Sequence, residues 1–440
     1  MNSSMKLKSL CRPLIAATAL IGAAALLHGA VKPDFTKRVQ SKVYAKTFDT
    51  HWQRLSDDYP YFELYQVDWD QERRDHRPLA LAAKNDDEFA WEIARLISAL
   101  PDPHVSFLPS MKTVKGKWSI PDAEVRFVER RIFVTRWPKD EAPTPPPKYQ
   151  DDPYAYPEII EIRGEAPSMT TDILVAGPVG TSFDIRLRWP DGTEMEHILR
   201  RPHTPNLPPP PKHLGEDWLI SGKVGSVGYI HIKTFDPDLA TLGPDGKITT
   251  MLRKALKELA DADSIILDFQ GNGGGLVAAS DPFLGHFLKR SQSYQWGNAK
   301  GKRRVIRTQR PRYNGKLVVI VDEASASGGE WAARILRDAG RATVIGGRTK
   351  GAEAAVLTSN GPDGSVVKFG GWPMIEPGIK PFQEVGVEVD FPIPLLIQDV
   401  HLLGYEQALA KVRRARIAKA CEVLGAPEST LEDLFQLASK

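Results

Sequence analysis

The segment 322–330 combines the residue types and the setting that a serine nucleophile requires. It carries Ser325 and Ser327 in a small, glycine-bearing turn. The run before it, Leu317–Val321, is short and β-branched, which predicts a buried strand, and the apolar spacing in Glu330–Ala339 predicts a helix. A serine on such a strand-to-helix turn presents its hydroxyl beside the free N–H groups of the helix start. The turn therefore favours a nucleophile, and the alternative is that its serines only cap the helix.

A glycine-rich loop elsewhere in the chain could serve the same chemistry. Residues 271–275 read Gly-Asn-Gly-Gly-Gly and follow a strand-like segment that ends at Asp268. Glycines let a backbone approach a ligand closely and offer bare N–H groups, although such a loop can also be merely flexible. The loop does not match GxGxxG and lacks the lysine of a phosphate loop, so nucleotide binding has little support.

A histidine that could act as a base follows a predicted helix. Asp87–Leu100 carries apolar residues at helical spacing, with Asp86 or Asp87 as its predicted N-cap. Asp102-Pro103-His104 comes directly after it. His104 could reach the surface of another domain from there, or it could bond the backbone of its own turn. The local sequence leaves both interpretations open.

The elements that must position these residues begin with two blocks of different character. Residues 35–100 are predicted to be helical. Residues 123–201 read as short strands, and these are Val125–Val128, Ile132–Val134, Ile159–Ile162, Phe183–Trp189 and Met195–Leu199. Two proline-rich connectors, Pro143–Pro147 and Pro208–Pro211, cannot pair into a sheet. The second connector predicts a domain boundary.

From Val224 to Ile397 apolar strands alternate with helices, which is typical of an α/β layer with parallel strands. The predicted strands are Val227–Ile232, Ser264–Leu267, Leu317–Val321 and Thr343–Ile345. The predicted helices are Thr250–Ala260, Asp281–Lys289 and Glu330–Ala339. After His401 the chain is predicted to be helical to its end.

The composition argues against several classes of protein. The formal net charge is only +3 over 440 residues, without a basic stripe that carries aromatic residues, so nucleic-acid binding is not expected. The HExxH pattern and clustered Cys and His residues are absent, so no metal site is expected. Cys11 and Cys421 are the two cysteines, and loss of an N-terminal signal would leave only one of them.

The N-terminal residues have the layout of a secretory signal. Lys6, Lys8 and Arg12 precede an uncharged run, Leu14–Leu27, and the small residues Gly29-Ala30 follow. The run is too short for a comfortable membrane span, so it predicts either a cleaved signal or an uncleaved anchor through residues 14–27. We expect an exported protein, periplasmic or secreted, with no stable membrane span after cleavage of the signal.

Several motifs, taken in order, resemble those of the S41 serine peptidases, the tail-specific or carboxy-terminal processing peptidases. The segment from Phe48-Asp49 through Trp52, Tyr59 and Val67-Asp68-Trp69 to His104 resembles the family's N-terminal lead-in. Val227–Phe235 resembles the family's "GYI.I..F" strand, and Leu267–Gly275 resembles its "LD.RGN.GG" loop, with Gln270 at the arginine position. Val321–Glu330 resembles its nucleophile turn, and Gly386–Asp390 resembles its "GV.PD" segment.

The resemblance implies a multidomain α/β protein with a ClpP/crotonase-like catalytic domain, a helical N-terminal domain and a degenerate PDZ-like β domain. The implied division is a signal peptide or anchor at 1–30, the helical domain at 31–110, the PDZ-like domain at 118–204, the S41 catalytic domain at 213–400 and C-terminal helices at 401–440. A carboxylate-binding loop of the Gly-Leu-Gly-Phe type is absent near Ala123, so capture of peptide tails by strand addition has no support.

The resemblance also implies the roles of the candidate residues. Ser327, three residues before Glu330, matches the family's nucleophile, which leaves Ser325 a structural role. The tricorn-like branch of the family uses a histidine and a glutamate, which match His104 and Glu384. The oxyanion hole would be formed by backbone N–H groups of Gly328, Gly273 and Gly274.

The Ser–Lys branch of the family offers an alternative base. Its lysine position matches Ala352, and Lys350 stands two residues earlier. Because all three groups of a Ser327–His104–Glu384 triad are present, we prefer the triad to a Ser327–Lys350 pair. Glu330 is most simply interpreted as a helix-capping residue.

The implied function is that of a serine endopeptidase that hydrolyses exported polypeptides without a metal or cofactor. A second class is a catalytically weak or inactive binding protein on the same scaffold. An acyl-CoA enzyme is disfavoured by the export signal, and an α/β-hydrolase by the absence of a GxSxG elbow. The sequence leaves the substrate preference and the oligomeric state open.

Overall fold

The computed structural model describes residues 35–110, 112, 117–168, 174–206, 218–235, 246–297, 303–374 and 380–439. The expected signal or anchor at residues 1–30 lies outside this part of the chain. Contacts divide the chain after Gln40, and Ser41–Lys440 form a single unit. In the described ranges, no helix has the length and apolar character that crossing a membrane would need.

A six-stranded sheet carries the elements that were predicted to hold the nucleophile. Its order is β18 (Phe391–Pro392), β15 (Thr343–Gly346), β14 (Lys316–Val321), β11 (Ser264–Asp268), β10 (Val227–Ile232) and β9 (Leu219–Val224). Every neighbouring pair is parallel except β9 and β10. The predicted parallel α/β layer is therefore confirmed, and the carboxyl ends of β10, β11, β14 and β15 meet at one edge.

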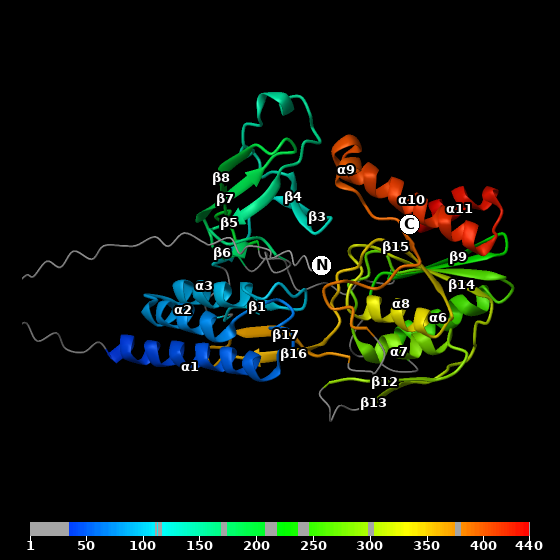
Figure 1. Cartoon of the computed structure of the whole chain (residues 1–440), viewed down its shortest axis with the longest axis horizontal. Coiled ribbons are helices and arrows are strands. Elements are labelled where there is room, and N and C mark those ends of the chain that lie inside the picture. The colour runs from blue at the N-terminus through cyan, green and yellow to red at the C-terminus, as the bar shows by residue number, and fades with distance from the viewer. Residues whose placement is uncertain are drawn as a thin grey trace, which may run out of the picture. The chain divides into compact units, whose positions relative to one another are not determined.

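Helices cover both faces of this sheet (Figure 1). One face packs against α6 (Lys247–Glu258), α7 (Val277–Gly285) and α8 (Gly328–Asp338), and the other against α10 (Tyr405–Leu424) and α11 (Leu431–Ala438). Residues of β14 alternate between the two cores, with Val319 in the first and Val318 in the second. Burial on both faces explains why this strand reads as a continuous apolar run.

The predicted bounds of α7 were wrong by four residues at each end. The helix spans Val277–Gly285, whereas the sequence predicted Asp281–Lys289. Phe283 and Leu284 inside the helix and Phe287 and Leu288 after it all lie in the same core. Because the helix and the turn that follows bury apolar side chains equally well, the pattern could not fix the helix end.

The N-terminal block is helical, as predicted, with α1 (Phe35–Asp58), α2 (Trp69–Ala82) and α3 (Asp86–Ser98). The predicted N-cap of α3 was wrong. Asn85 occupies that position in an extended conformation, and its side chain accepts the N–H of Glu88 at 2.9 Å. Asp86 and Asp87 instead lie in the first turn, where their charges favour the positive end of the helix dipole.

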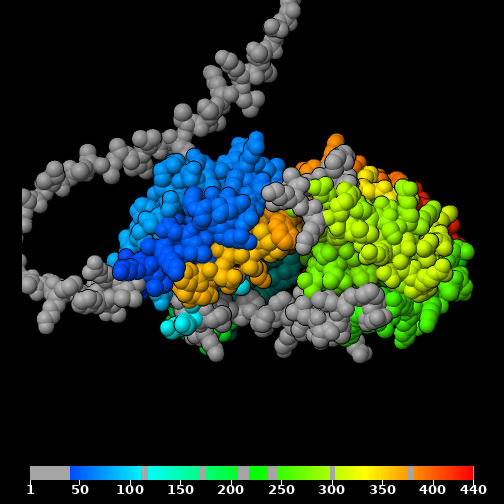
Figure 2. Space-filling view, turned by 90° about the horizontal axis from the view of Figure 1, so that it is seen from below, coloured from blue at the N-terminus to red at the C-terminus, as the bar shows by residue number. Residues whose placement is uncertain are grey.

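A hairpin from late in the sequence packs on these helices. It consists of β16 (Ala355–Asn360) and β17 (Val366–Trp372), and β17 pairs with β1 (Ser106–Leu108). Val367 and Phe369 share a core with α1 and α3, and Figure 2 shows the orange hairpin against the blue helices. The hairpin was not foreseen, because the sequence placed all of 213–400 in one domain.

The middle block folds into an antiparallel sheet, as its hairpin signals predicted. Its order is β3 (Glu124–Val128), β4 (Arg131–Arg136), β5 (Glu158–Ile162), β7 (Ser182–Arg188) and β8 (Glu194–Arg200).

The remaining described elements are β2 (Trp118–Ser119), η1 (Pro147–Tyr149), β6 (Gly177–Pro178), β12 (Gln292–Gln295), β13 (Arg303–Ile306), α9 (Ile397–Leu403) and η3 (Glu428–Thr430).

Candidate active site

Ser327 is the N-cap of α8, and its backbone is strained. It has φ 48° and ψ −117°, a region that non-glycine residues rarely adopt. Its N–H donates to Glu330 Oε2 at 2.8 Å, and its carbonyl accepts the N–H of Trp331 at 2.9 Å. These bonds hold an unfavourable conformation at the end of the turn, and backbone strain of this kind is concentrated at functional sites.

The other serine of the turn is locked inside the structure. Ser325 is fully buried, and its hydroxyl donates to the Phe269 carbonyl at 2.8 Å. The same hydroxyl accepts the Asp322 N–H at 2.9 Å. Because both functions of the hydroxyl are used by the backbone, the geometry agrees with a structural role for Ser325.

The glycine loop that follows β11 lies directly against this turn. The Ala326 N–H donates to the Asn272 carbonyl at 2.9 Å. A Cβ atom at Gly274, which has φ 93°, would lie 2.7 Å from the Cβ of Ser327 and 2.7 Å from the Gly328 nitrogen. Only glycine permits this approach, so the loop and the turn form one surface beside Ser327.

The three predicted oxyanion donors are not equivalent. The Gly274 N–H already donates to Asn272 Oδ1 at 2.8 Å, so it is not free for an oxyanion. The N–H groups of Gly273 and Gly328 have no hydrogen-bond partner in the described ranges. Gly274 therefore serves the close approach to Ser327, and two of the predicted donors stay available.

Glu330 does more than cap α8. The side chain is fully buried and accepts hydrogen bonds from Thr349 Oγ1 at 2.5 Å and from the N–H groups of Gly351 at 2.6 Å and Ala352 at 2.9 Å. Burial raises the pKa of Glu330 to about 7. Together with the bond from Ser327, these contacts tie the nucleophile turn to the loop that follows β15.

His104 lies on the short segment between α3 and β1. Its N–H donates to Asp102 Oδ1 at 2.8 Å, while Asp102 Oδ2 accepts the Tyr59 hydroxyl at 3.2 Å. Asp102 is fully buried, and burial raises the pKa of its carboxyl to about 6. The backbone of His104 is therefore anchored in the core of the N-terminal block.

The ring of His104 is in a different situation from its backbone. Both ring nitrogens are buried and have no hydrogen-bond partner in the described part of the chain. Burial, and next the charge of Lys350, lower the pKa of His104 to about 4. The imidazole is thus neutral at neutral pH, and no hydrogen bond joins it to the described atoms of Ser327 or Glu384.

The backbone of Glu384 is held from several sides. It has φ 67°, its N–H donates to the Gly351 carbonyl at 2.9 Å, and its own carbonyl accepts from Arg130 and Arg348 at 2.8 and 2.7 Å. The residue before it, Gln383, is also held, because its N–H donates to Glu353 Oε2 at 3.0 Å.

Sequence reasoning missed the residues that support Glu384. Glu353 is buried and accepts the N–H groups of Phe382 and Gln383, while Gln383 Nε2 donates to the Tyr65 hydroxyl at 3.0 Å. This network connects the segment before Glu384 with the N-terminal block. The sequence signal for this network was Glu353 itself, a single charged residue among the small residues of segment 351–355.

Lys350 borders the nucleophile turn. Its N–H donates to the Ser325 carbonyl at 3.0 Å. Its side-chain nitrogen has no hydrogen bond or ion pair to a described residue, and its charge lowers the pKa of His104, so the two side chains lie near one another. The alternative base is therefore close to the preferred one.

A buried arginine from α10 fastens the loops below the site. Arg416 is fully buried, donates to Gln270 Oε1 at 3.1 Å, and binds both carboxylate oxygens of Glu323 at 2.9 Å. Gln270 stands where the resemblance expects an arginine. The run of basic residues in this helix predicts a solvated face that includes Arg416, and for Arg416 this prediction is wrong, because its side chain is fully buried. Among the described residues, no group of three His, Cys, Asp or Glu side chains could hold a metal ion.

A serine on a strand-to-helix turn, packed against a glycine loop at the edge of a parallel sheet, is the arrangement of a serine hydrolase. Residues 226–393, from β10 to β18, match the model of peptidase family S41. The chain therefore contains an S41 peptidase domain.

Two relatives illustrate the likeness in sequence. Carboxy-terminal processing protease CtpB of Bacillus subtilis (strain 168) is 28% identical over 243 residues, which are 52% of this chain and 47% of that protein. Carboxyl-terminal-processing peptidase 3, chloroplastic, of Arabidopsis thaliana is 26% identical over 249 residues, 53% of this chain and 46% of the relative. The matches thus span about half the length of these relatives.

A solved structure shows the same fold over most of the chain. Mature CPAF superposes with a TM-score of 0.58 and 13% sequence identity, covering 87% of this chain and 98% of CPAF. At this identity the likeness concerns the fold, and it supports a multidomain α/β architecture similar to that of CPAF.

Proposed function

We propose that this chain is a serine endopeptidase that cleaves exported polypeptides through an acyl-enzyme on Ser327. The relatives that it matches are named carboxy-terminal processing proteases, and the S41 domain contains every residue of the nucleophile turn. The observation that carries the proposal is the start of α8. There a strained Ser327 lies against Gly274, beside the free N–H groups of Gly273 and Gly328.

His104 would act as the general base. A serine hydroxyl is a weak nucleophile until a base accepts its proton, and His104 is neutral and has two unused ring nitrogens. His104 would take the Ser327 proton as the oxygen attacks the scissile carbonyl, and then give it to the leaving amine. Water would next hydrolyse the acyl-enzyme with the same base. Glu384 would orient the imidazole and stabilise the imidazolium ion.

The N–H groups of Gly328 and Gly273 would bind the oxyanion of the tetrahedral intermediate. Each such donor contributes about 3–4 kcal/mol to transition-state stabilisation. Gly274 would shape the hole without donating to it, because its N–H is used by Asn272.

We assign residues 213–400 to a ClpP/crotonase-like catalytic domain. The other blocks would support it, and these are a helical domain at 31–110, a PDZ-like β domain at 118–204 and C-terminal helices at 401–440. The hairpin β16–β17 would be part of the catalytic domain that packs on the helical domain and brings His104 towards the sheet edge. Its contacts support this, since Ser359 and Ser365 bond the buried His51 of α1 at 2.9 Å each.

A Ser327–Lys350 pair is the second candidate for the same reaction. One observation favours it: the Lys350 side chain has no bonded partner among the described residues, and the Lys350 N–H bonds the Ser325 carbonyl of the turn at 3.0 Å. We prefer His104 because its ring is neutral and needs no loss of a proton before it can act as a base.

The test is labelling by a fluorophosphonate probe followed by mass spectrometry of the labelled peptide. Wild-type protein should be labelled on Ser327, and Ser327→Ala should not be labelled. The matched control Ser325→Ala, checked for folding by its thermal melt, should still be labelled. Equal labelling of Ser327→Ala would contradict the proposal, and a wild-type protein without any label would favour the inactive binding protein.

A further inference from the structure

A cavity of about 170 Å³ lies at the carboxyl ends of β10 and β11, on the face of the sheet that α10 and α11 cover. His231 and Asp268 line it from the strands, and Arg413 lines it from α10. Helix α8, which Ser327 caps, packs on the opposite face, so this cavity is separate from the proposed active site. Its volume is below the about 300–1,000 Å³ of sites for drug-sized molecules, which limits it to a small ligand.

Arg413 is the cation of this cavity, and the chain gives it no anion. Helix α10 carries four other basic residues, and each of them forms an ion pair; the pairs are Lys411 with Asp399, Arg414 with Glu432, Arg416 with Glu323 and Lys419 with Glu422. Arg413 forms no hydrogen bond or ion pair with a described residue. Its guanidinium group is therefore available to an anionic group of a ligand.

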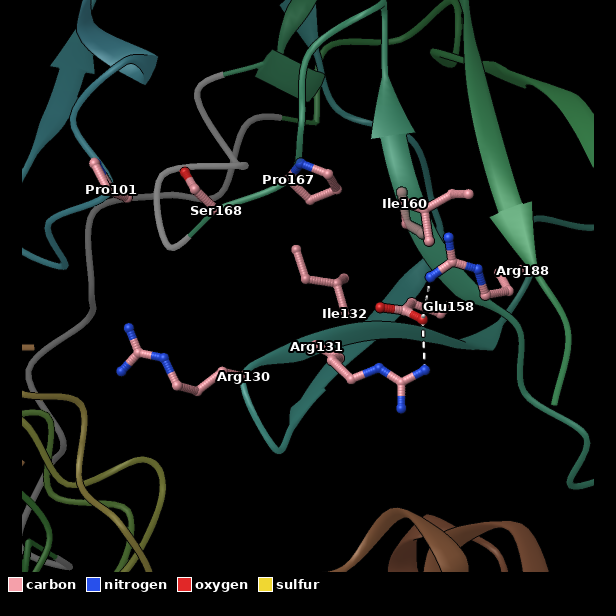
Figure 3. A pocket seen from close by; sticks show the side chains of 10 residues that line it. Pro101, Arg130, Arg131, Ile132, Glu158, Ile160, Pro167, Ser168 and Arg188 are labelled. Atoms are coloured by element: carbon pink, nitrogen blue, oxygen red, sulfur yellow. Dashed lines mark hydrogen bonds and ion pairs between the residues drawn. The ribbon is translucent and has the colours of Figure 1, made fainter. Parts of the chain in front are cut away.

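A second cavity, of about 430 Å³ beside the antiparallel sheet, shows how arginines are arranged when the chain itself supplies the anion. Glu158 forms ion pairs there with both Arg131 and Arg188 (Figure 3). The cavity of Arg413 differs from this arrangement, because no carboxylate bridges to the arginine within the described ranges.

The two carboxylates that share the cavity with Arg413 are otherwise placed. Asp268 accepts the Tyr229 hydroxyl at 2.5 Å, and it accepts the N–H and Nε2 of Gln270 at 2.8 and 3.1 Å. Glu406 is largely exposed, and its ion pair is a loose one with Arg126 at 3.9 Å. Asp268 is thus committed to its neighbours, whereas the Glu406 carboxylate remains open to solvent at the edge of the cavity.

His231 supplies a second unsatisfied group. Its Nε2 lies 3.1 Å from the carbonyl oxygen of Gln270. Because a carbonyl oxygen can only accept, Nε2 carries the proton, and in the neutral imidazole Nδ1 is then a bare acceptor. This Nδ1 atom is buried and has no hydrogen-bond partner among the described residues. The cavity therefore combines an unused cation with an unused acceptor.

We propose that this cavity binds a small zwitterion, namely a free α-amino acid with a short apolar side chain. Arg413 binds its carboxylate, and His231 Nδ1 and the Glu406 carboxylate accept from its ammonium group. A ligand with only an anion leaves His231 without a donor, and a ligand with only a cation is repelled by Arg413. The apolar wall that contacts the ligand's side chain consists of Leu409, Ile417 and Phe435.

Isothermal titration calorimetry of the purified protein with L-alanine and L-valine tests the site without any need for peptidase activity. We expect saturable binding of both amino acids. N-acetyl-L-alanine lacks the ammonium group, and L-alaninamide lacks the carboxylate. Each should bind at least about tenfold more weakly than L-alanine, because each leaves one group of the cavity without its partner. Inorganic phosphate should also bind at least about tenfold more weakly.

Arg413→Gln should weaken the binding of L-alanine at least about tenfold, because it removes the partner of the carboxylate. Arg414→Gln is the matched control, since it removes the same charge from the next residue of the helix, an arginine that is already paired. It should bind L-alanine like wild type, and a thermal melt checks that both variants are folded. Absence of saturable binding, an analogue or phosphate that binds as tightly as L-alanine, or wild-type affinity in Arg413→Gln would overturn the proposal.

Discussion

The nucleophile turn and the segment of the proposed base differ in how completely their polar groups are satisfied. In the turn, the Ser325 hydroxyl is bonded by the backbone on both sides, and Glu330 accepts from four donors. On the base segment, Asp102 anchors the backbone of His104, yet both ring nitrogens are buried without a described partner. The polar side chains of the turn thus have their hydrogen-bond partners within the chain, whereas the His104 ring has none among the described residues.

This difference indicates that substrate binding must complete the hydrogen bonds of the His104 ring. A buried polar group without a partner costs about 1–3 kcal/mol, so His104 gains from any arrangement that supplies hydrogen bonds to its ring. Ser327 on one side and Glu384 on the other are the partners that the proposed mechanism assigns. Catalytic hydrogen bonds often form only in the complex with substrate. The turn is thus preorganised, and the base would be completed on binding.

The largest effect is expected from removing the nucleophile and the base together. Ser327→Ala and His104→Ala should each lower kcat/KM by a factor of about 10⁴ or more, because each group depends on the other. The double variant should be no worse than either single variant. Steady-state kinetics on a peptide that wild type cleaves measure this, and losses that multiply in the double variant would show that the two residues do not act as a unit.

The next largest effect concerns the support below the turn. Arg416→Met removes a fully buried cation and leaves the half-buried Glu323 carboxylate without its partner, which should cost about 3 kcal/mol of unfolding free energy, the low end for a buried ion pair. Arg414→Met on the same helix removes an exposed pair with Glu432 and should change stability by less than about 1 kcal/mol. Chemical denaturation compares the two variants, and equal stabilities would contradict a supporting role for Arg416.

A smaller loss of stability is expected inside the turn. Glu330→Gln keeps the size of the side chain but places an NH₂ group against N–H donors such as that of Gly351. The mismatch should lower the unfolding free energy by about 2 kcal/mol, as for other buried groups left without partners. Thermal unfolding measures the change. A variant as stable as wild type would mean that these contacts do not tie the turn to the loop after β15.

The smallest expected effect is a shift in the pH at which kcat/KM begins to fall on the acid side. Because burial and then Lys350 lower the pKa of His104 to about 4 from 6.5, the ring stays neutral, and kcat/KM should hold until the pH falls towards 4. Lys350→Met removes a charge that disfavours the imidazolium, so the acid limb should move to higher pH. Burial is the larger cause, so the limb should stay below 6.5.

The profile of kcat/KM against pH for wild type, Lys350→Met and the control Lys257→Met, at an exposed position of α6, tests this. Wild type and the control should have the same acid limb. A wild-type limb near 6.5 would show that the working base is not in the buried environment of His104.

Much of the fold could be predicted from the sequence, because β10, β11, β14 and β15 are short, apolar and separated by helical patterns. The hairpin β16–β17 could not be, since its partner β1 and the helices that cover it come more than two hundred residues earlier. The helix end at α7 failed for a local reason, because helix and turn bury the same kinds of side chain.

The candidate site likewise contains residues that the sequence could predict and residues that it could not. The turn with Ser325 and Ser327 and the glycine loop 271–275 follow from local patterns, the resemblance then selects Ser327, and the structure packs the loop against the turn. Support from Glu353, Gln383 and Arg416 could not be read from the sequence, because a buried polar side chain is defined by partners that are remote in the chain. The preference for His104 and Glu384 came from family resemblance and is still a proposal.

The most direct test of the central claim is a crystal structure of the protein with a phosphonate bound covalently to its nucleophile. We predict that the adduct is on Ser327 Oγ and that a ring nitrogen of His104 lies within about 3 Å of that oxygen. The other ring nitrogen should face the Glu384 carboxylate. An adduct on Ser325, or Lys350 Nζ in the place of the His104 ring, would contradict the claim.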